Sequence, residues 1–195
     1  MIRLMTNISF RRIDRVTVED NGFLHKLDQD YIRGLPTRIF LNLEGHKNSS
    51  PSYQVNRHER FTQTASRAER DGANIALISA ALIHDIVDEL APEKHSEVAA
   101  EIIRFYISTK VTSILEKHYL FQMCYYAAKL GFKKIAEIPI ATINFPLRLR
   151  NSIKKLGQMS FGPEQLTNEL SHFEPIVREI FMRPPFDLAI ILEHR

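Results

Sequence analysis

The chain of 195 residues is poor in the features that mark several classes of protein. It holds one cysteine, Cys124, so it cannot form an internal disulfide, as is typical of reducing compartments. No apolar run approaches the roughly 20 residues that a helix needs to cross a bilayer. The N-terminal MIRLMTNISFRRIDR lacks the apolar core of a signal peptide. We therefore expect a cytoplasmic protein with no membrane partner.

Several catalytic and binding motifs are absent as well. The sequence has no glycine-rich phosphate loop, no Gly-x-Ser-x-Gly and no paired cysteine motif. The formal net charge is +3, and basic residues cluster loosely at Lys129, Lys133, Lys134, Arg148, Arg150, Lys154 and Lys155. A solvated helix face would explain this cluster, and a patch that attracts an anionic ligand is the alternative. No aromatic residues interleave with the charges, so we expect no nucleic-acid partner.

What the sequence contains is a series of helical patterns. Gly72 is the only glycine or proline between Arg57 and Ala91, which predicts helices over 57–70 and 74–89 joined by the turn DGAN. Apolar spacing predicts further helices over 95–107 and 109–126, one over 147–156, and one or two within 162–181. Segment 135–145 is ambiguous between loop and strand. We expect an all-α bundle, a single domain over 5–195, with 44–56 as a linker between an N-terminal helical segment and the core.

A histidine and an aspartate stand next to each other at the end of the apolar run 75–86. Adjacent helical residues point about 100° apart, so His84 and Asp85 can share one centre only over a helix end or groove. His95 opens the next expected helix, and His118 lies on the apolar face of the following one. Together the four side chains could hold a metal ion such as iron, manganese or zinc. The alternative is a histidine that is merely satisfied within the core.

The sequence resembles the HD-domain superfamily. The blocks that carry the resemblance are YIRGLPTR (31–38), QTASRAERDGA (63–73), ALIHDIVDELAP (81–92), HSEVAAEIIRFYIS (95–108), KHYLFQ (117–122) and HFEPIVREIFMRPP (172–185). They are similar to one branch, the mixed-valent di-iron oxygenases that cleave aminoethylphosphonates, related to myo-inositol oxygenase. The resemblance begins at Met5, so Met1 and Met5 both stay open as the translated start.

The resemblance implies a set of metal ligands that this chain keeps only in part. In the family, one iron is bound by a first histidine, the His-Asp pair and a final aspartate. The other iron shares the aspartate of the His-Asp pair and is also bound by two later histidines. His84, Asp85, His95 and His118 match these positions, whereas the first histidine is replaced by Arg60 and the final aspartate by Gly157. His58 would face another side of its helix, so we do not accept it as a substitute.

Both losses fall on the same iron, so the resemblance implies at most one divalent metal, iron or manganese, or none. We expect the Arg60 guanidinium to occupy the emptied position and pair with Asp85. Asp88, Tyr119 and Gln122 stand at positions that line the family's pocket, and Tyr119 in place of glycine should narrow its mouth. Asp88 and Glu89 could instead form a polar pair at a helix end.

Three functions stay open on this evidence. The first is a non-catalytic homologue, retained as a scaffold or as a binder of a small phosphonate-like or phosphate-like anion. The second is an active iron-dependent oxygenase acting on a small phosphonate-like substrate. The third is a phosphohydrolase, but its metal would need the ligand set that is damaged here. The sequence does not determine the oligomeric state.

Overall fold

The computed structural model describes residues 7–49, 54–126, 129, 131 and 164–192, and every regular element within them is helical. The all-α prediction is therefore confirmed. In chain order the elements are η1 (Ile13–Arg15), α1 (Val18–Arg33), α2 (Leu35–Gly45), η2 (His46–Asn48), α3 (Arg57–Arg70), α4 (Ile75–Ile83), α5 (His95–Ile103), α6 (Thr109–Tyr126), η3 (Leu170–Phe173), α9 (Glu174–Phe181) and α10 (Leu188–Ile191).

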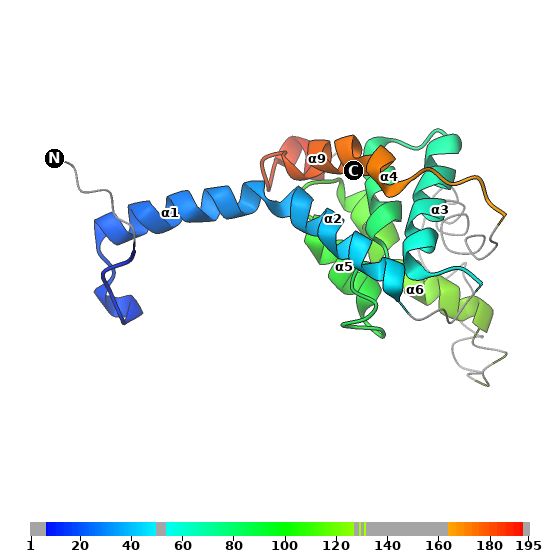
Figure 1. Cartoon of the computed structure of the whole chain (residues 1–195), viewed down its shortest axis with the longest axis horizontal. Helices are drawn as coiled ribbons and strands as arrows, with labels where there is room; N and C mark the ends of the chain where they lie inside the picture. The colour runs from blue at the N-terminus through cyan, green and yellow to red at the C-terminus, as the bar shows by residue number, and fades with distance from the viewer. Residues whose placement is uncertain (1–6, 50–53, 127–128, 130, 132–163, 193–195) are drawn as a thin grey trace.

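The core of the bundle is built around α4, with α2, α3, α5, α6 and α9 about it (Figure 1). The sequence of α4, IALISAALI, has no charged residue, as expected of a helix that is covered on nearly all sides. Leu82 and Ile83 of α4 pack in one apolar cluster with Phe61 of α3, Ile103 of α5 and Ile180 of α9. This cluster holds the polar residues described below in fixed positions.

Helix α3 is unusual because it buries polar side chains. Its sequence, RHERFTQTASRAER, is mostly polar, yet His58, Arg60, Gln63, Thr64 and Ser66 are all buried. Buried polar groups are costly unless they are paired, so such a helix face indicates a polar site inside the bundle.

The predicted boundaries of α3 and the turn after it are confirmed. Asn56 and Glu59 form a reciprocal cap at the start of α3, each side chain accepting from the other's backbone N–H at 2.8 Å. After α3 the chain turns at Gly72, whose positive φ of 74° favours glycine. Asn74 then caps α4 by accepting from the Leu77 N–H at 3.0 Å.

The prediction of a helix over 74–89 is wrong at its C-terminal end. Helix α4 ends at Ile83, and the chain continues in tight turns in which Ile86, Asp88 and Leu90 donate to carbonyls three residues earlier. The apolar spacing runs on through Ile86, so periodicity could not show this end. His84 and Asp85 both lie in this turn, where His84 Nε2 lies 3.2 Å from Asp85 Oδ2.

Two other helices are shorter than predicted. Helix α5 ends at Ile103 rather than at 107, and the free carbonyl of Phe105 accepts from the Phe186 N–H at 3.1 Å. Residues 164–169 are not helical, because their polar groups bind α3 instead, for example the Asn168 N–H to Ser66 Oγ at 2.9 Å. The expected helix over 109–126 is present as α6.

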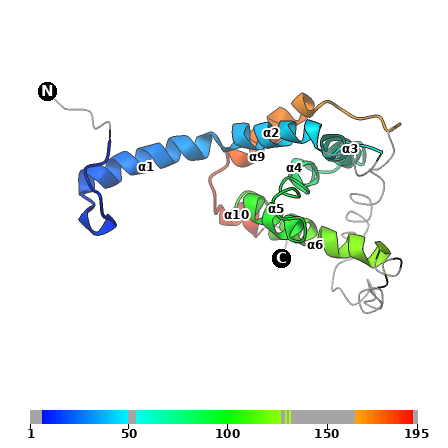
Figure 2. The ribbon, with the colours of Figure 1, turned by 60° about the horizontal axis from the view of Figure 1, so that its bottom comes forward.

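Helix α1 projects from the bundle as an arm, and the views in Figures 1 and 2 agree on this. Gly34 joins it to α2, which packs on the core through Ile39 and Leu43. The segment between α2 and α3 overlaps most of the linker expected over 44–56, and η2 lies within this segment. None of the described helices combines the length and the apolar character that a membrane crossing requires.

Some expectations lie outside the described residues. These are segment 135–145, the helix expected over 147–156, the position of Gly157 and the basic residues beyond Lys129.

Candidate metal centre

Four of the predicted residues meet inside the bundle. His84 follows the last residue of α4, Asp85 lies in the next turn, His95 is the first residue of α5, and His118 lies on α6. All four are buried, and Asp85 is only 2% exposed. Elements separated in the chain therefore bring one carboxylate and three imidazoles to the same place.

One carboxylate oxygen, Asp85 Oδ1, forms a nearly equilateral triangle with two imidazole nitrogens. It lies 3.3 Å from His95 Nε2 and 3.2 Å from His118 Nε2, and these two nitrogens lie 3.1 Å apart. Donors that bind a common ion at about 2.1 Å and lie 90–110° apart are separated by roughly 3.0–3.4 Å. Within the part of the chain that the structure describes, Asp85, His95 and His118 are the group that could hold a metal ion.

Hydrogen bonds at Nδ1 of the three histidines orient the rings so that Nε2 faces the Asp85 carboxylate. His84 Nδ1, His95 Nδ1 and His118 Nδ1 each lie 2.7 Å from the main-chain carbonyl three residues earlier. A carbonyl only accepts, so each Nδ1 donates its N–H. In the neutral form of each ring, Nε2 of His95 and of His118 therefore carries a lone pair, which is the form that binds metals.

The Nε2 atoms of His95 and His118 lie 3.1 Å apart, and both face Asp85 Oδ1. When both Nε2 atoms are unprotonated, two lone pairs and a carboxylate oxygen converge with no positive charge among them. A cation at the triangle resolves this conflict, so the residues present fit a metal ion.

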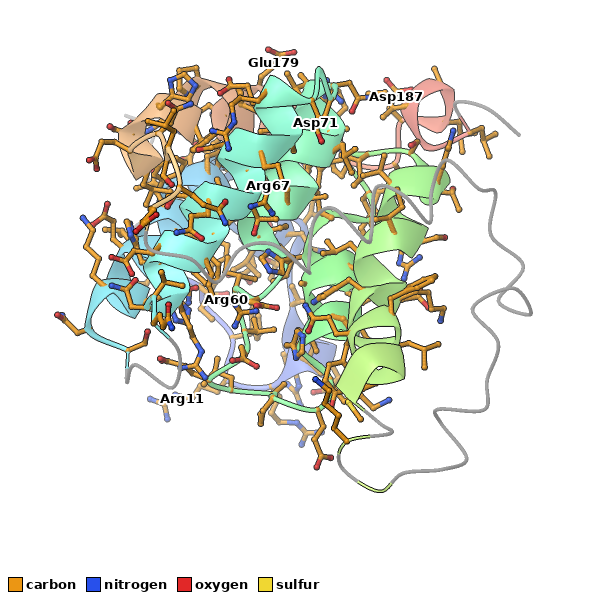
Figure 3. The ribbon with its side chains drawn as sticks, turned by 90° about the vertical axis from the view of Figure 1, so that its right-hand side faces the viewer. Arg11, Arg60, Arg67, Asp71, Glu179 and Asp187 are labelled. Carbon is orange, nitrogen blue, oxygen red and sulfur yellow. The ribbon has the colours of Figure 1, made fainter. Side chains whose placement is uncertain are left out.

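The other carboxylate oxygen, Asp85 Oδ2, faces different partners. The Arg60 guanidinium donates to it from Nη2 at 2.7 Å, and His84 Nε2 lies 3.2 Å from it. Figure 3 shows Arg60 reaching from α3 toward the middle of the bundle. The expected ion pair between Arg60 and Asp85 is present, and it is buried, since Arg60 is 8% exposed. His84, predicted as a ligand beside His95 and His118, lies on the Arg60 side of the carboxylate.

The electrostatics of Asp85 reflect these neighbours. Burial by itself would raise the pKa of the Asp85 carboxyl. The charges of His84 and Arg60, with hydrogen bonds from His118 and His84, outweigh burial and hold this pKa well below its ordinary value. Asp85 is therefore ionised at neutral pH and offers a full negative charge to cations on both sides.

The remaining pocket candidates have separate roles. Asp88 pairs with Arg57 of α3 through a 2.7 Å contact to Nε, and its other oxygen lies 3.5 Å from His95 Nδ1. It thus forms an ion pair with α3, which neither of the two expectations for Asp88 included. Tyr119 sets its ring edge against His95, with ring centroids 5.1 Å apart. Gln122 has a buried Nε2 that finds no hydrogen-bond partner in the described structure.

His58 does not replace the missing histidine. Its Nε2 lies 4.0 Å from Glu44 Oε1 of α2, away from the shared carboxylate. This placement agrees with the expectation that it faces another side of α3. Since Gly157 lies outside the described residues, the second substituted position has no structural description.

Two neighbours of the site were not predicted from the sequence. Arg57 anchors the turn after α4 through Asp88. His46 binds the Ile86 carbonyl at 3.1 Å and packs edge-on against Phe61, whose ring also meets His84. The position of Arg57, three residues before Arg60 on the same helix, is a signal that could have identified it.

No protein-family model matches the chain, and no curated protein is significantly similar to it. The resemblance to the HD-domain superfamily therefore rests on the sequence blocks quoted above.

Proposed function

We propose that this chain is an HD-domain protein that holds one divalent metal ion at Asp85 Oδ1, His95 Nε2 and His118 Nε2. In this proposal Arg60 takes the place of a second ion, so the protein differs from the di-iron oxygenases that it resembles. The observation that carries the proposal is the division of one carboxylate between two sets of partners, the imidazole nitrogens at Oδ1 and the guanidinium at Oδ2.

The donor set indicates the class of metal. Two imidazoles and one carboxylate suit iron or manganese, and zinc also accepts such ligands. When bound, such an ion acts as a Lewis acid toward an oxygen ligand. The residues of the chain fix the imidazoles, exclude solvent from Asp85 and supply the second positive charge through Arg60.

The charge of the loaded site indicates its ligand. A divalent ion and the Arg60 guanidinium together carry three positive charges, and Asp85 is the one carboxylate in contact with both. Asp88, the next carboxylate, is already paired with Arg57. The excess positive charge favours a small anion, so the function supported best is binding of a phosphate-like or phosphonate-like molecule.

Elemental analysis of the purified protein tests the metal site. We expect about one iron or manganese per chain, because the triangle has three donors and Arg60 fills the neighbouring position. His118→Ala should lose the metal, whereas His172→Ala, which removes an exposed histidine paired with Glu69, should keep it. Two ions per chain, or none, would contradict the proposal, and so would an unchanged content in His118→Ala.

The same samples test the ligand class. Methylphosphonate and inorganic phosphate should raise the melting temperature of the metal-loaded protein and leave His118→Ala unchanged. An equal rise in both proteins would show that any anion binding lies elsewhere on the molecule.

A further inference from the structure

The imidazole of His95 lies between two aspartates, and the centre described above uses only one of them. Nε2 of His95 lies 3.3 Å from Asp85 Oδ1, and Nδ1 of the same ring lies 3.5 Å from Asp88 Oδ1. The side chain of Asp88 is 18% exposed, so water screens its charge only in part. One carboxylate therefore lies beside the metal-binding nitrogen of this ring, and a second lies behind the ring.

Helix α3 holds both aspartates from the far side. Arg57 and Arg60 lie three residues apart on α3, and the two aspartates have the same spacing in the turn after α4. Arg60 Nη2 donates to Asp85 Oδ2 at 2.7 Å. Arg57 Nε donates to Asp88 Oδ2 at 2.7 Å. In each aspartate the other oxygen, Oδ1, is the one that faces His95, so the two arginines turn both carboxylates toward one imidazole.

The second ligand imidazole of the triangle lacks this additional carboxylate. Nδ1 of His95 donates to the Pro92 carbonyl at 2.7 Å, and Nδ1 of His118 donates to the Leu115 carbonyl at the same distance. Among the residues that the structure describes, no ion pair is formed at Nδ1 of His118. The two rings therefore have matching carbonyl partners and differ by one carboxylate, that of Asp88.

A carboxylate behind a ligand imidazole changes what the ring offers to an ion. Negative charge near the Nδ1–H group polarises this group and raises the electron density on Nε2, so the Nε2 lone pair becomes a stronger donor. The 3.5 Å contact of Asp88 is long for a hydrogen bond, so Asp88 acts on His95 mainly through its charge. Partners of this kind typically change the affinity for a metal ion by about 10-fold to 100-fold.

We propose that Asp88 is a positioning residue of the metal centre, which strengthens His95 as a ligand while Arg57 holds the Asp88 carboxylate behind the ring. This inference rests on the function proposed above, because it requires an ion at the triangle of donors. It gives the pair of Asp88 and Arg57 a role in metal binding in addition to joining α3 to the turn after α4.

The turn that carries Asp88 has a second anchor, so a conservative change there tests the carboxylate rather than the fold. His46 Nε2 lies 3.1 Å from the Ile86 carbonyl and donates to it, and His46 is buried. Asp88→Asn keeps the size of the side chain and one oxygen that can accept from Arg57. The variant therefore removes little more than the negative charge behind His95.

Titration of the metal-free protein with manganese, followed by the electron paramagnetic resonance signal of the free ion, measures the affinity. Asp88→Asn should bind manganese about tenfold more weakly than the wild-type protein. Glu101→Gln is the matched control, since it removes an exposed carboxylate of α5 that pairs with Arg104, and it should keep the wild-type affinity. Wild-type affinity in Asp88→Asn would overturn this inference and leave the proposed function intact. A wild-type protein that binds neither manganese nor iron would contradict the proposed function, and this inference with it.

An exchange of the two charges separates this role from that of a purely structural ion pair. The double variant Arg57→Asp with Asp88→Arg restores an ion pair between α3 and the turn, but it places a positive charge behind His95. We expect it to bind manganese at least as weakly as Asp88→Asn does. Recovery of the wild-type affinity in the double variant would show that the pair only joins the two segments, and would overturn the proposal.

The imidazole protons of the metal-free protein give a readout that a structural role would not move. In protein labelled with ¹⁵N at histidine, the Nδ1–H proton of His95 should shift upfield in Asp88→Asn, because the charge that polarises it is gone. The Nδ1–H proton of His118 is the internal control and should keep its position, since its partner is the Leu115 carbonyl. Equal shifts of the two protons, or no shift at His95, would overturn the proposal.

Discussion

At the scale of single residues, the centre depends on one carboxylate that is divided between two sets of partners. Asp85 receives the Arg60 guanidinium on Oδ2 and presents Oδ1 to His95 and His118. Removing one partner of a buried ion pair leaves the other charge without compensation, which costs far more than losing an exposed pair. Arg60 therefore has a structural role that is independent of any ligand.

The stability of the metal-free protein measures that role. Arg60→Ala should lower the free energy of unfolding by about 3–5 kcal/mol, because Asp85 keeps its charge in a buried place. The matched control is Arg178→Ala, which removes an exposed arginine bound to Glu174 at 2.8 Å and should cost less than about 1 kcal/mol. Urea unfolding of both variants gives the comparison. Equal losses would show that the Arg60 pair adds nothing beyond a surface contact.

The sequence was sufficient to bring Arg60, His84, His95 and His118 together about Asp85, but not to predict the side of the carboxylate on which each one lies. The resemblance placed Arg60 at a ligand position next to Asp85, and an arginine beside a buried carboxylate has one obvious partner. The position of His84 beside Oδ2 depends on the path of the turn after Ile83, which local pattern does not specify. Arg57 was missed because its contact with Asp88 joins residues that are 31 positions apart.

At the scale of elements, the sequence predicts a helix end correctly where a local cap fixes that end. It predicts the end wrongly where a tertiary contact fixes it. The start of α3 is fixed by Asn56 and Glu59, and the turn that follows it by Gly72, so these limits were predictable. The end of α4 follows from the turn that carries Asp85 to its partners. Residues 164–169 bind α3 through polar groups, and periodicity contains no information about such contacts.

The tip of α1 gives a prediction of pH dependence. The Asp20 carboxylate accepts from the Ser9 N–H at 2.6 Å and also from Thr17, and these bonds lower its pKa from 3.8 to about 2, against the opposing effect of burial. Because the folded pKa is the lower one, the cap stabilises the arm above pH 3.8 and loses this effect as the pH falls toward about 2.

Carboxyl NMR shifts and the helicity of α1 measured from pH 7 to 2 check this prediction. The Asp20 signal should titrate near pH 2, and Asp20→Asn should reduce α1 helicity at neutral pH and remove its acid-dependent loss. Asp28→Asn, on the same helix but away from the cap, is the control. An Asp20 signal that titrates at 3.8 would contradict the hydrogen bonds seen at the tip.

At the scale of the whole molecule, the bundle and the arm are structurally separate (Figures 1 and 2). The bundle encloses Asp85 with residues from α3, α5, α6 and the turn after α4, whereas the arm contacts mainly α2. An ion at the triangle would tie three segments of the bundle together and leave the arm untouched.

Hydrogen exchange can detect this division. Adding manganese to the metal-free protein should slow exchange in the turn 84–90, α5 and the part of α6 near His118, because an ion that binds only the folded state suppresses local opening there. Exchange in α1 should be unchanged, so it serves as the internal control. Uniform slowing over the whole chain would indicate binding elsewhere, and His95→Ala should abolish the effect.

The Arg60 guanidinium has one more consequence. An ion held by three side chains can be withdrawn by a chelator or lost when a cell is starved of it, but a charge attached to the backbone cannot. Arg60 therefore makes one of the positive charges at Asp85 permanent. A bundle of this kind should outlast repeated depletion and reloading, whereas one that relied on two exchangeable ions would be left with a bare carboxylate in its interior.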